Sequence, residues 1–447
     1  MANPKKVVII GSGPCGLGAA YRLKELGYQN WEIYEKNGHV GGLSASFRDE
    51  SGFTWDIGGH VIFSRHKYFD GLLGKLLGND YLQHRRQAFI RLGERWIPYP
   101  FQNNIRYLPM RESWDCLGGL LSARAEKEAV YGNFKEWILA QFGGGIAKHF
   151  MFPHNLKAWA HPLEDMSYGW ISGGVSVVGK GRTLANFLLY RKDSTWGYNS
   201  VFKFPASGGT GEIFRRMVPY IKEHLFLHKE ASRIDTVDKE VVFSDGTKTN
   251  YDILINTMPL DKFVTASGLY GFYQAAKQLK HNSVLAVGVG LDKGRLSEKC
   301  WVYFPENNCP FHRVTYFSNY SGNNVPDKEY SSLICETVYS DSRPCDKERV
   351  IEETIQGLIN AGVLSGEDKK HIISKYLIHA EYAYPIPTLG RDKALNTIQP
   401  HLKKNDIYSC GRFGAWRYEF SDTGHSLMQG VDAVDEILGI AKGLKLC

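Results

Sequence analysis

Residues 5–27 read KKVVIIGSGPCGLGAAYRLKELG, and this stretch decides the expected fold. The short run VVII predicts a buried strand, and the apolar residues after the glycines recur at helical spacing. Between the two, Gly11 is expected to make a tight turn, and Gly13 lets backbone N–H groups approach a pyrophosphate. Gly16 allows the helix to pack closely on the strand. The stretch therefore predicts the strand–turn–helix unit of a dinucleotide-binding domain.

A second predicted strand, WEIYEK at residues 31–36, follows this helix and ends in an acid. Glu35 lies where a carboxylate can accept hydrogen bonds from a ribose hydroxyl, which strengthens the prediction. The next loop, KNGHVGGLSASF, places Gly41 and Gly42 at an offset that resembles FAD proteins of the amine-oxidase and glutathione-reductase type. That resemblance implies FAD as the dinucleotide, with these glycines covering its pyrophosphate and ribityl chain.

The chain is expected to leave the dinucleotide-binding domain and return to it. Residues 204–214 (FPASGGTGEIF) supply another glycine-rich loop before a helix, and residues 226–259 alternate like strands. We therefore expect an α/β fold: an FAD-binding Rossmann-like (GxGxxG) domain with a helical insertion domain and an antiparallel β-sheet insertion domain. The expected divisions are residues 1–103, 199–260 and 395–447 for the FAD-binding domain, 104–198 for the helical domain and 261–394 for the sheet domain.

Bulk composition argues against several other classes of protein. The 447 residues carry a formal net charge of +7 that is scattered along the chain, so we expect no nucleic-acid partner. The apolar run near the N-terminus is too short for a signal peptide or a membrane span, so a cytoplasmic protein without membrane insertion is expected. The eight cysteines show no CxxC and no zinc spacing, which predicts free thiols and no metal site.

Several longer blocks are more specific than the glycine motif. Together they resemble the UDP-galactopyranose mutase family, particularly its eukaryotic-type branch, and the similarity is colinear from the first strand to about Gly439. The blocks are DIGGHVIFSRHKYFD (56–70), WIPYPFQNNI (96–105), NLKAW (155–159), CWVYFPENNCPFHRVTYFSNYS (300–321), AYPIPTLGRD (383–392) and GRFGAWRYEFSDTGHS (411–426).

The resemblance implies an FAD-dependent isomerase that interconverts the pyranose and furanose forms of a nucleotide sugar, UDP-galactopyranose and UDP-galactofuranose. In this family reduced flavin N5 forms a covalent adduct with the sugar, and there is no net redox change. NADPH or NADH is implied as the reductant, bound in the active site itself, because no second GxGxxG precedes a helix. Furanose sugars point to cell-surface glycan biosynthesis. The sequence leaves homo-oligomerisation open.

The resemblance also assigns substrate-binding residues, because the departing diphosphate needs cationic and hydroxyl donors and uridine needs an aromatic slot. His60, Arg313 and Arg412 are the expected catalytic residues. The expected diphosphate-binding residues are Arg313, Arg412, Tyr303, Tyr384 and Tyr418. The expected uridine region comprises Tyr99, Phe101, Gln102, Phe150, Asn155 and Trp159, with Trp301 beside it, and Asp422 is expected near the sugar.

The expected FAD contacts gather at the glycine turns and at the N-terminus of a C-terminal helix, residues 426–438. A helix N-terminus stabilises the negative charge of anionic reduced flavin. The expected cofactor-binding residues are Gly11, Gly13, Pro14, Cys15, Gly16, Glu35, Lys36, Gly41, Gly42, Leu43, Ser44, Gly59, His60, Gly411, Arg412, Ser426 and Met428.

The chain departs from the family pattern at two places. Gly174 stands where the flap of the eukaryotic-type enzymes carries an arginine, and Asp422 stands where the family has asparagine. Residue 423 loses an amide as well. These changes leave open a mutase for a different nucleotide hexose or heptose. A redox flavoenzyme of the amine-oxidase type is the alternative from another class, because it shares the N-terminal half of the pattern.

Overall fold

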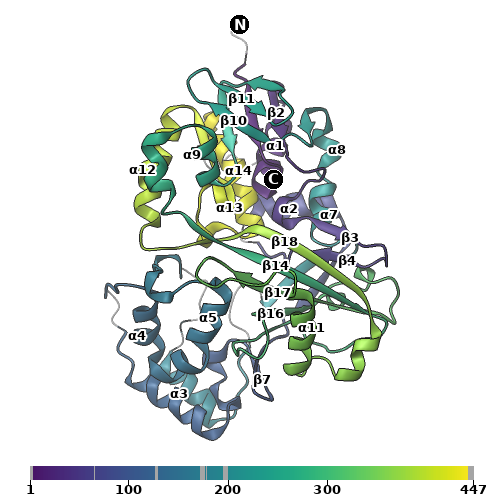
Figure 1. Cartoon of the computed structure of the whole chain (residues 1–447), viewed down its shortest axis with the longest axis vertical. Helices are drawn as coiled ribbons and strands as arrows, with labels where there is room; N and C mark the ends of the chain where they lie inside the picture. Colours follow the sequence, from purple (N-terminus) through teal and green to yellow (C-terminus); the bar gives the residue numbers. More distant parts are fainter. Residues whose placement is uncertain are drawn as a thin grey trace.

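The computed structural model describes residues 4–64, 66–125, 129–171, 177, 179–194 and 200–440. Three regions follow one another along the long axis of the molecule (Figure 1). A parallel sheet with its helices lies at the end that carries the N-terminus, a large second sheet crosses the middle, and a helical region lies at the far end beside that sheet. Gly174, one of the two expected departures, lies outside the described residues.

The parallel sheet has five strands in the order β19-β13-β1-β2-β9, and every neighbouring pair is parallel. All four residues of β1 are buried, as expected for a strand covered on both faces. The strands are β1 (Val7–Ile10), β2 (Trp31–Tyr34), β9 (Leu225–Phe226), β13 (Ile253–Asn256) and β19 (Ile407–Ser409). Segments from the beginning, the middle and the end of the chain therefore build one sheet, as a returning chain requires.

Two helices from opposite ends of the chain pack against each other beside this sheet. They are α1 (Pro14–Glu25) and α14 (Thr423–Ile437). Leu17 of α1 and Leu427 and Val431 of α14 are fully buried in the same apolar cluster as Val7 and Ile9. Figure 1 shows α14 in the yellow of the C-terminal residues beside the purple α1.

The second sheet has seven strands in the order β18-β14-β17-β16-β15-β6-β7. Its strands between residues 261 and 394 pair antiparallel, as expected, and one parallel pair joins β15 to β6. The parallel pair arises because β6 and β7, which fall within residues 1–103, hydrogen-bond into this sheet. The strands are β6 (Ala88–Leu92), β7 (Arg95–Pro98), β14 (Lys280–Leu291), β15 (Trp301–Tyr303), β16 (Arg313–Tyr316), β17 (Ser331–Tyr339) and β18 (Ile372–Ile386).

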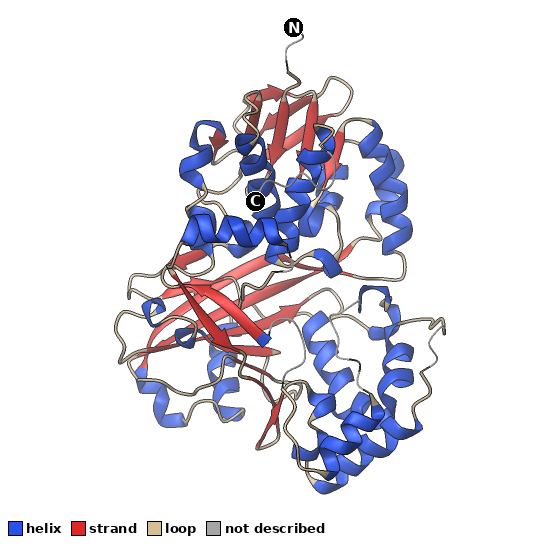
Figure 2. Ribbon diagram, turned by 180° about the vertical axis from the view of Figure 1, so that it is seen from behind, coloured by secondary structure: helices blue, strands red, loops and turns tan. Residues whose placement is uncertain are grey.

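The helical region packs around its own apolar core, which includes Phe101, Phe134 and Phe142, each 0% exposed. Its helices are α3 (Met110–Ser122), α4 (Phe134–Ile146), α5 (Phe152–Trp159) and α6 (Lys180–Leu188). A π-helical turn at Ala147–Met151 joins α4 to α5 and sets the direction in which α5 points. Figure 2 shows this group of helices from behind, next to the edge of the large sheet.

The remaining elements cover the sheets or connect them. No helix within the described ranges is long and apolar enough to cross a membrane. The other helices are α2 (Lys67–Leu77), α7 (Gly211–Arg215), α8 (Val218–Ile221), α9 (Leu260–Ala266), α10 (Tyr273–Ala276), α11 (Val350–Asn360), α12 (Arg391–Lys404) and α13 (Gly411–Gly414). The other strands are β3 (Ser46–Arg48), β4 (Thr54–Asp56), β5 (Tyr81–Arg85), β8 (Val201–Pro205), β10 (Ala231–Asp235), β11 (Glu240–Phe243) and β12 (Lys248–Asn250).

Candidate active site

Two cavities lie where the three regions meet. The first, which we call the α14 cavity, has a volume of about 160 Å³ and lies at the N-terminus of α14. It contains seven of the residues expected from the sequence. Its lining comprises Leu43, Ile57, Gly59, His60, Val61, Phe63, Val284, Arg313, Glu336, Ala380, Ala383, Tyr384, Arg412, Asp422 and Thr423.

The second cavity, which we call the α5 cavity, has a volume of about 190 Å³ and lies between α5 and the large sheet. Nine expected residues line it. Its lining comprises Tyr99, Gln102, Phe150, Met151, His154, Asn155, Ala158, Trp159, Trp170, Tyr303, His312, Arg313, Tyr384 and Tyr418. Arg313 and Tyr384 line both cavities, so one guanidinium and one phenol ring stand at the boundary between them.

Arg313 is held by a carboxylate that sequence reasoning missed. Its Nε donates to Oε1 of Glu336 at 2.7 Å, and its Nη2 donates to Oε2 at 2.8 Å. The two residues are register partners on β16 and β17, which sets this geometry. Burial works against the cation, but the 1%-exposed Glu336 outweighs it and raises the pKa of Arg313 above its usual value. The guanidinium therefore remains positively charged in a half-buried place.

The same carboxylate reaches the loop that carries His60. The backbone N–H of Gly59 donates to Oε1 of Glu336 at 3.1 Å. A lone glutamate in the apolar strand sequence SSLICETVY was a signal for this role, since a charge buried in a sheet needs a partner.

Arg412 is fixed by backbone carbonyls. Its Nη1 donates to the carbonyl of Ala383 at 3.1 Å, and its Nε and Nη2 both donate to the carbonyl of Ser421, at 3.2 and 2.9 Å. The guanidinium also lies 5.5 Å from the ring centroid of Tyr384. Neutral carbonyls orient the cation and leave its charge in place, which suits a group that must attract an anionic ligand.

His60 faces the α14 cavity as a neutral imidazole. Burial lowers its pKa to about 4, and the nearby cations of Arg412 and Arg313 act in the same direction. Its Nδ1 is buried and has no hydrogen-bond partner among the described residues. A buried polar atom left in this state is suited to a ligand that enters the cavity.

The α5 cavity is aromatic on several sides. The ring of Phe150 stacks between Phe101 and His154, with centroid distances of 4.7 and 4.9 Å. Tyr303 lies on one side, 5.1 Å from His154 and 5.5 Å from Tyr99. Such walls suit a flat ring that stacks against aromatic side chains.

On the other side of the α5 cavity, Tyr418 packs edge-on against Trp159 and Trp170 at 4.8 and 5.4 Å. Burial raises the pKa of Tyr418, and of Tyr384 nearby, so both phenols keep their protons and can donate hydrogen bonds.

Sequence reasoning also missed two histidines that line the α5 cavity and an asparagine that binds the backbone of two of its lining residues. Burial lowers the pKa of His154 and of His312 to about 3 each, so both are neutral. Asn282 accepts from the backbone N–H of Tyr384 at 3.1 Å and donates to the carbonyl of Trp159 at 3.0 Å. His154 was detectable, because it lies four residues after Phe150 on one helix face. Asn282 had no local signal.

Asp422 is the N-cap of α14. Its carboxylate accepts from the backbone N–H of His425 at 2.8 Å and also contacts Nδ1 of the His425 imidazole. Burial opposes ionisation, but these bonds to His425 outweigh it, and the pKa of Asp422 lies below its usual value. The ionised carboxylate lines the α14 cavity while its oxygens serve the helix, a role that asparagine would also fill.

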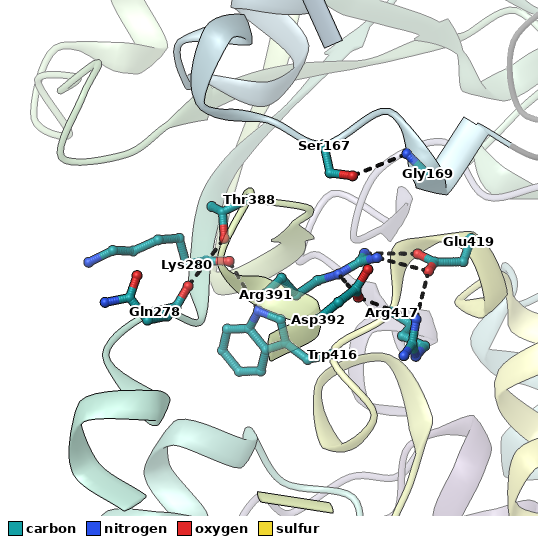
Figure 3. A network of polar contacts seen from close by, with 10 residues as sticks. All are labelled: Ser167, Gly169, Gln278, Lys280, Thr388, Arg391, Asp392, Trp416, Arg417 and Glu419. Carbon is teal, nitrogen blue, oxygen red and sulfur yellow. Dashed lines mark hydrogen bonds and ion pairs between the residues drawn. The ribbon is translucent and has the colours of Figure 1, made fainter. Parts of the chain in front are cut away.

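A buried ion network holds the loop that carries Tyr418 (Figure 3). Arg391, 1% exposed, donates through Nη1 and Nη2 to both oxygens of Glu419, at 3.0 and 3.1 Å. Arg417 donates to the same carboxylate at 3.3 Å and to Asp392 at 3.5 Å. Arg417 is therefore part of this network, whereas the expected Arg412 faces the cavity.

The glycine turns form a cradle that would not admit side chains. A Cβ on Gly16 would lie 1.9 Å from the carbonyl oxygen of Gly11, and a Cβ on Gly42 would lie 3.0 Å from the Cα of Gly13. The turns before α1 and after β2 thus touch, joined by the bond from the N–H of Gly41 to the carbonyl of Ser12 at 2.9 Å. Together with the N-terminus of α1, this bare backbone fits a pyrophosphate.

The other expected cofactor contacts are more varied. The two oxygens of Glu35 accept four bonds from Ser12 and Asn37, between 2.7 and 3.0 Å, so this acid also braces its own turn. The side chain of Lys36 is exposed. Pro14 begins α1, and Cys15 after it is buried. Ser44 is buried near Thr423, and Gly411 begins α13. Ser426 and Met428 are buried in α14.

Two expected substrate residues do not line either cavity. Phe101 is 0% exposed behind Phe150, where it supports the stack. Trp301 packs against Phe202 at 6.0 Å in a separate apolar cluster. Trp301 was expected because it lies two residues from Tyr303, yet the large side chains behind it bury it in the core.

Comparison with known proteins shows the family of the chain. The family model of flavin containing amine oxidoreductases matches residues 14–438. A 15-cis-phytoene desaturase of Arabidopsis thaliana is 35% identical over 89 residues, which is 20% of this chain and 16% of that protein. An L-amino-acid oxidase of Notechis scutatus scutatus is 36% identical over 95 residues, 20% of this chain and 18% of that protein. The chain thus aligns with less than a fifth of the length of these curated relatives.

Solved structures give a match over the whole length. A crystal structure of reduced UDP-galactopyranose mutase superposes with a TM-score of 0.94 and 42% identity, over 98% of this chain and 94% of that one. A protoporphyrinogen oxidase-like structure from Exiguobacterium sp. 255-15 reaches a TM-score of 0.73 at 16% identity, over 97% and 99%, and shares the fold. The chain therefore belongs to the flavin containing amine oxidoreductases and, within them, to the UDP-galactopyranose mutase family.

Proposed function

We propose that the chain interconverts the pyranose and furanose forms of UDP-galactose with reduced FAD as cofactor. One observation carries the proposal: the α14 cavity and the α5 cavity meet at Arg313 and Tyr384. A nucleotide base in the aromatic α5 cavity would place its diphosphate at this boundary and its sugar in the α14 cavity. The base would then contact aromatic side chains, the diphosphate would contact Arg313 and Tyr384, and the sugar would lie in the α14 cavity.

FAD would bind along the glycine cradle, with the isoalloxazine ring reaching the N-terminus of α14. When bound, reduced FAD supplies a nucleophilic centre for the anomeric carbon, with no net redox change. The positive end of the α14 dipole would stabilise negative charge at that position. His60, neutral and with Nδ1 unused among the described residues, would hydrogen-bond to the groups that meet there.

The chain's cations would hold the diphosphate after it leaves the sugar and present it for return. Arg412, oriented by two carbonyls, and Arg313, oriented by Glu336, both keep their charge. The protonated phenols of Tyr384 and Tyr418 add hydrogen-bond donors beside them. Preorganised donors of this kind stabilise developing negative charge without reorganising during the reaction.

The experiment is a turnover assay on the purified flavoprotein reduced with dithionite under argon. UDP-galactofuranose should convert to UDP-galactopyranose in many turnovers per flavin, and the oxidised protein should be inactive. A parallel assay in air uses the oxidised protein without dithionite. Turnover there that consumes oxygen in proportion to product would instead mean an amine-oxidase-type reaction.

A panel of other nucleotide furanoses decides the sugar. Asp422 lines the α14 cavity where the family has an amide, which favours testing N-acetylated, deoxy and heptose relatives beside galactose. Faster conversion of one of these would replace galactose in the proposal and leave the reaction type unchanged.

The finer features of the sequence resemblance belong to the same proposal. They are membership of the eukaryotic-type branch, NADPH or NADH as the reductant acting in the same site, cytoplasmic location and a place in cell-surface glycan biosynthesis. The expected domain divisions also remain a proposal. Flavin reduction by NADPH and by NADH, followed at 450 nm without dithionite, tests the reductant.

A further inference from the structure

Two cysteines from opposite ends of the chain touch beside the glycine cradle. Cys15 lies in the first turn of α1, and Cys410 is the N-cap of α13. Their Sγ atoms are 3.3 Å apart, although the residues are separated by 395 positions in sequence. The seven cysteines within the described residues are all free thiols, so this contact joins two reduced side chains.

The surrounding backbone holds the two sulfurs together. β1 and β19 flank β13 in the parallel sheet, so the turns that follow them lie at the same edge. The N–H of Cys410 donates to the carbonyl of Asn256 at 2.9 Å, which ties its turn to β13. Gly411 has φ +82°, and a Cβ there would lie 2.9 Å from the Cβ of Cys15. Glycine at this position leaves the room that the Cys15 side chain fills.

We propose that Cys15 and Cys410 are a redox-sensitive pair that hydrogen peroxide converts to a disulfide across the cofactor cradle. A disulfide has an S–S length of about 2.05 Å, so the sulfurs need to approach by about 1.3 Å. Neither thiol takes part in the proposed mutase reaction, and the inference does not depend on which sugar the protein binds.

The two thiols differ in exposure, and this difference determines which of them reacts with peroxide first. Cys410 is half-buried, whereas Cys15 is 3% exposed. The Cys410 sulfur attacks one peroxide oxygen, the O–O bond breaks, and Cys410 sulfenic acid and water form. The Cys15 sulfur then attacks the Cys410 sulfur, a second water leaves, and the disulfide forms. Peroxide gains the two electrons that the two thiols lose. Burial raises the pKa of the Cys15 thiol, which lowers its thiolate fraction, so Cys410 is the thiol that peroxide oxidises first.

The bond would join the first turn of α1 to the N-cap of α13. Both segments border the cradle and come from distant parts of the chain, so the cross-link would oppose their separation. Release of bound FAD should therefore be slower from the oxidised protein than from the reduced protein. This readout rests on FAD binding in the cradle, whereas formation of the cross-link does not.

The test treats the FAD-loaded protein with hydrogen peroxide, denatures it, alkylates the remaining thiols and digests it with trypsin. Two of the eight thiols should be lost, and a disulfide-linked pair of the peptides 7–22 and 405–412 should appear. Dithiothreitol should restore both thiols. Cys410→Ser should leave Cys15 open to alkylation after denaturation, and the matched variant Cys345→Ser, at another half-buried thiol, should still form the cross-link.

Two outcomes would overturn the proposal. Cys15 could remain fully alkylated while Cys410 proceeds to sulfinic acid, or the lost thiols could belong to other cysteines. FAD release, followed by flavin fluorescence, gives a second measurement. An unchanged release rate in the cross-linked protein would remove the proposed effect on the cradle. Lack of mutase turnover in either form would bear only on the proposed function.

Discussion

Glu336 holds both ends of the Arg313 fork, at 2.7 and 2.8 Å, from the neighbouring strand of the large sheet. The pair stands at the boundary of the two cavities, and the same carboxylate accepts the N–H of Gly59 beside His60. One buried acid therefore fixes the position of a cation and of the loop that carries His60, both at the α14 cavity. It acts through Arg313 and the loop, as a positioning residue.

We predict that Glu336→Gln lowers kcat/KM by about 10- to 100-fold, because an amide cannot accept from both donors of the fork, each charged hydrogen bond being worth about 1.5–3 kcal/mol. Bound FAD, measured by its absorbance ratio at 450 and 280 nm, should be retained. The control is Glu352→Gln, because Glu352 is an exposed acid whose partner, Lys375, lies on the surface. Equal losses in both variants would contradict a specific role for Glu336.

Arg412→Ala and Arg313→Ala should each reduce turnover by at least roughly tenfold with FAD still bound, the cost of about one charge-assisted contact. Arg417→Ala is the matched control for Arg412, since it lies five residues away in the same loop and pairs with Glu419 and Asp392. Its effect on turnover should stay below about threefold, in the range of a half-exposed ion pair. Loss of FAD with loss of activity would make Arg412 structural.

Buried neutral histidines should make the protein sensitive to acid. His60 has a pKa of about 4, and His154 and His312 have pKa values of about 3, all below the ordinary value of 6.5. Their stabilisation is fully present above pH 6.5. As the pH falls toward 4, these histidines become protonated in the unfolded chain but stay neutral in the folded protein. The free energy of unfolding therefore decreases by up to about 1.4 kcal/mol per pH unit per histidine.

Asp56 has the opposite effect on the free energy of unfolding as the pH falls, because burial raises its pKa to about 6 and the folded protein then binds the proton more readily than the unfolded chain. A difference between variants therefore isolates one histidine. Urea unfolding of His154→Gln between pH 4 and 7 should give a shallower pH dependence than the unsubstituted protein. His228→Asn, at an exposed position, should leave the dependence unchanged. Identical slopes for all three proteins would refute the assignment of a neutral His154.

The cap at Asp422 gives a prediction about stability and about the sugar. Asp422→Ala should lower the free energy of unfolding by about 0.5–2 kcal/mol, the usual cost of losing an N-cap. Asp422→Asn should keep the cap and cost less, while it restores the amide of the family. If Asp422 sets sugar preference, Asp422→Asn should shift the relative kcat/KM within the furanose panel. If the relative kcat/KM values of the furanoses do not change, Asp422 acts only as the N-cap of α14.

The parallel sheet could be predicted from the sequence, and many of the expected site residues line the two cavities, for a physical reason. Gly11, Gly13 and Gly16 encode their turn locally, and the aromatic blocks carry their residues close together in the chain. Asn282 and His312 could not be found in this way, because each acts on a partner from another strand or another region. Glu336 gave the signal of a charge in an apolar strand, but its partner Arg313 is supplied by strand register. Trp301 shows the converse: Tyr303, two residues further on, lines the α5 cavity, whereas the residues around Trp301 in space bury it in the core.

The mixed large sheet illustrates the same limit. The parallel pairing of β15 with β6 depends on a segment more than 200 residues earlier in the chain. No local signal distinguishes a strand that joins its nearest sheet from one that crosses to the next region.

The contact between α1 and α14 has a consequence for how the protein is made. α1 is synthesised first, but the surface that covers its apolar face is encoded some 400 residues later. At about 5–20 residues per second, a ribosome needs roughly 20 to 80 s to supply it. During that interval the nascent chain must keep an uncovered helix and an incomplete sheet from aggregating. A complete site at the N-terminus of α14 therefore requires that α14 has been synthesised and has packed on α1.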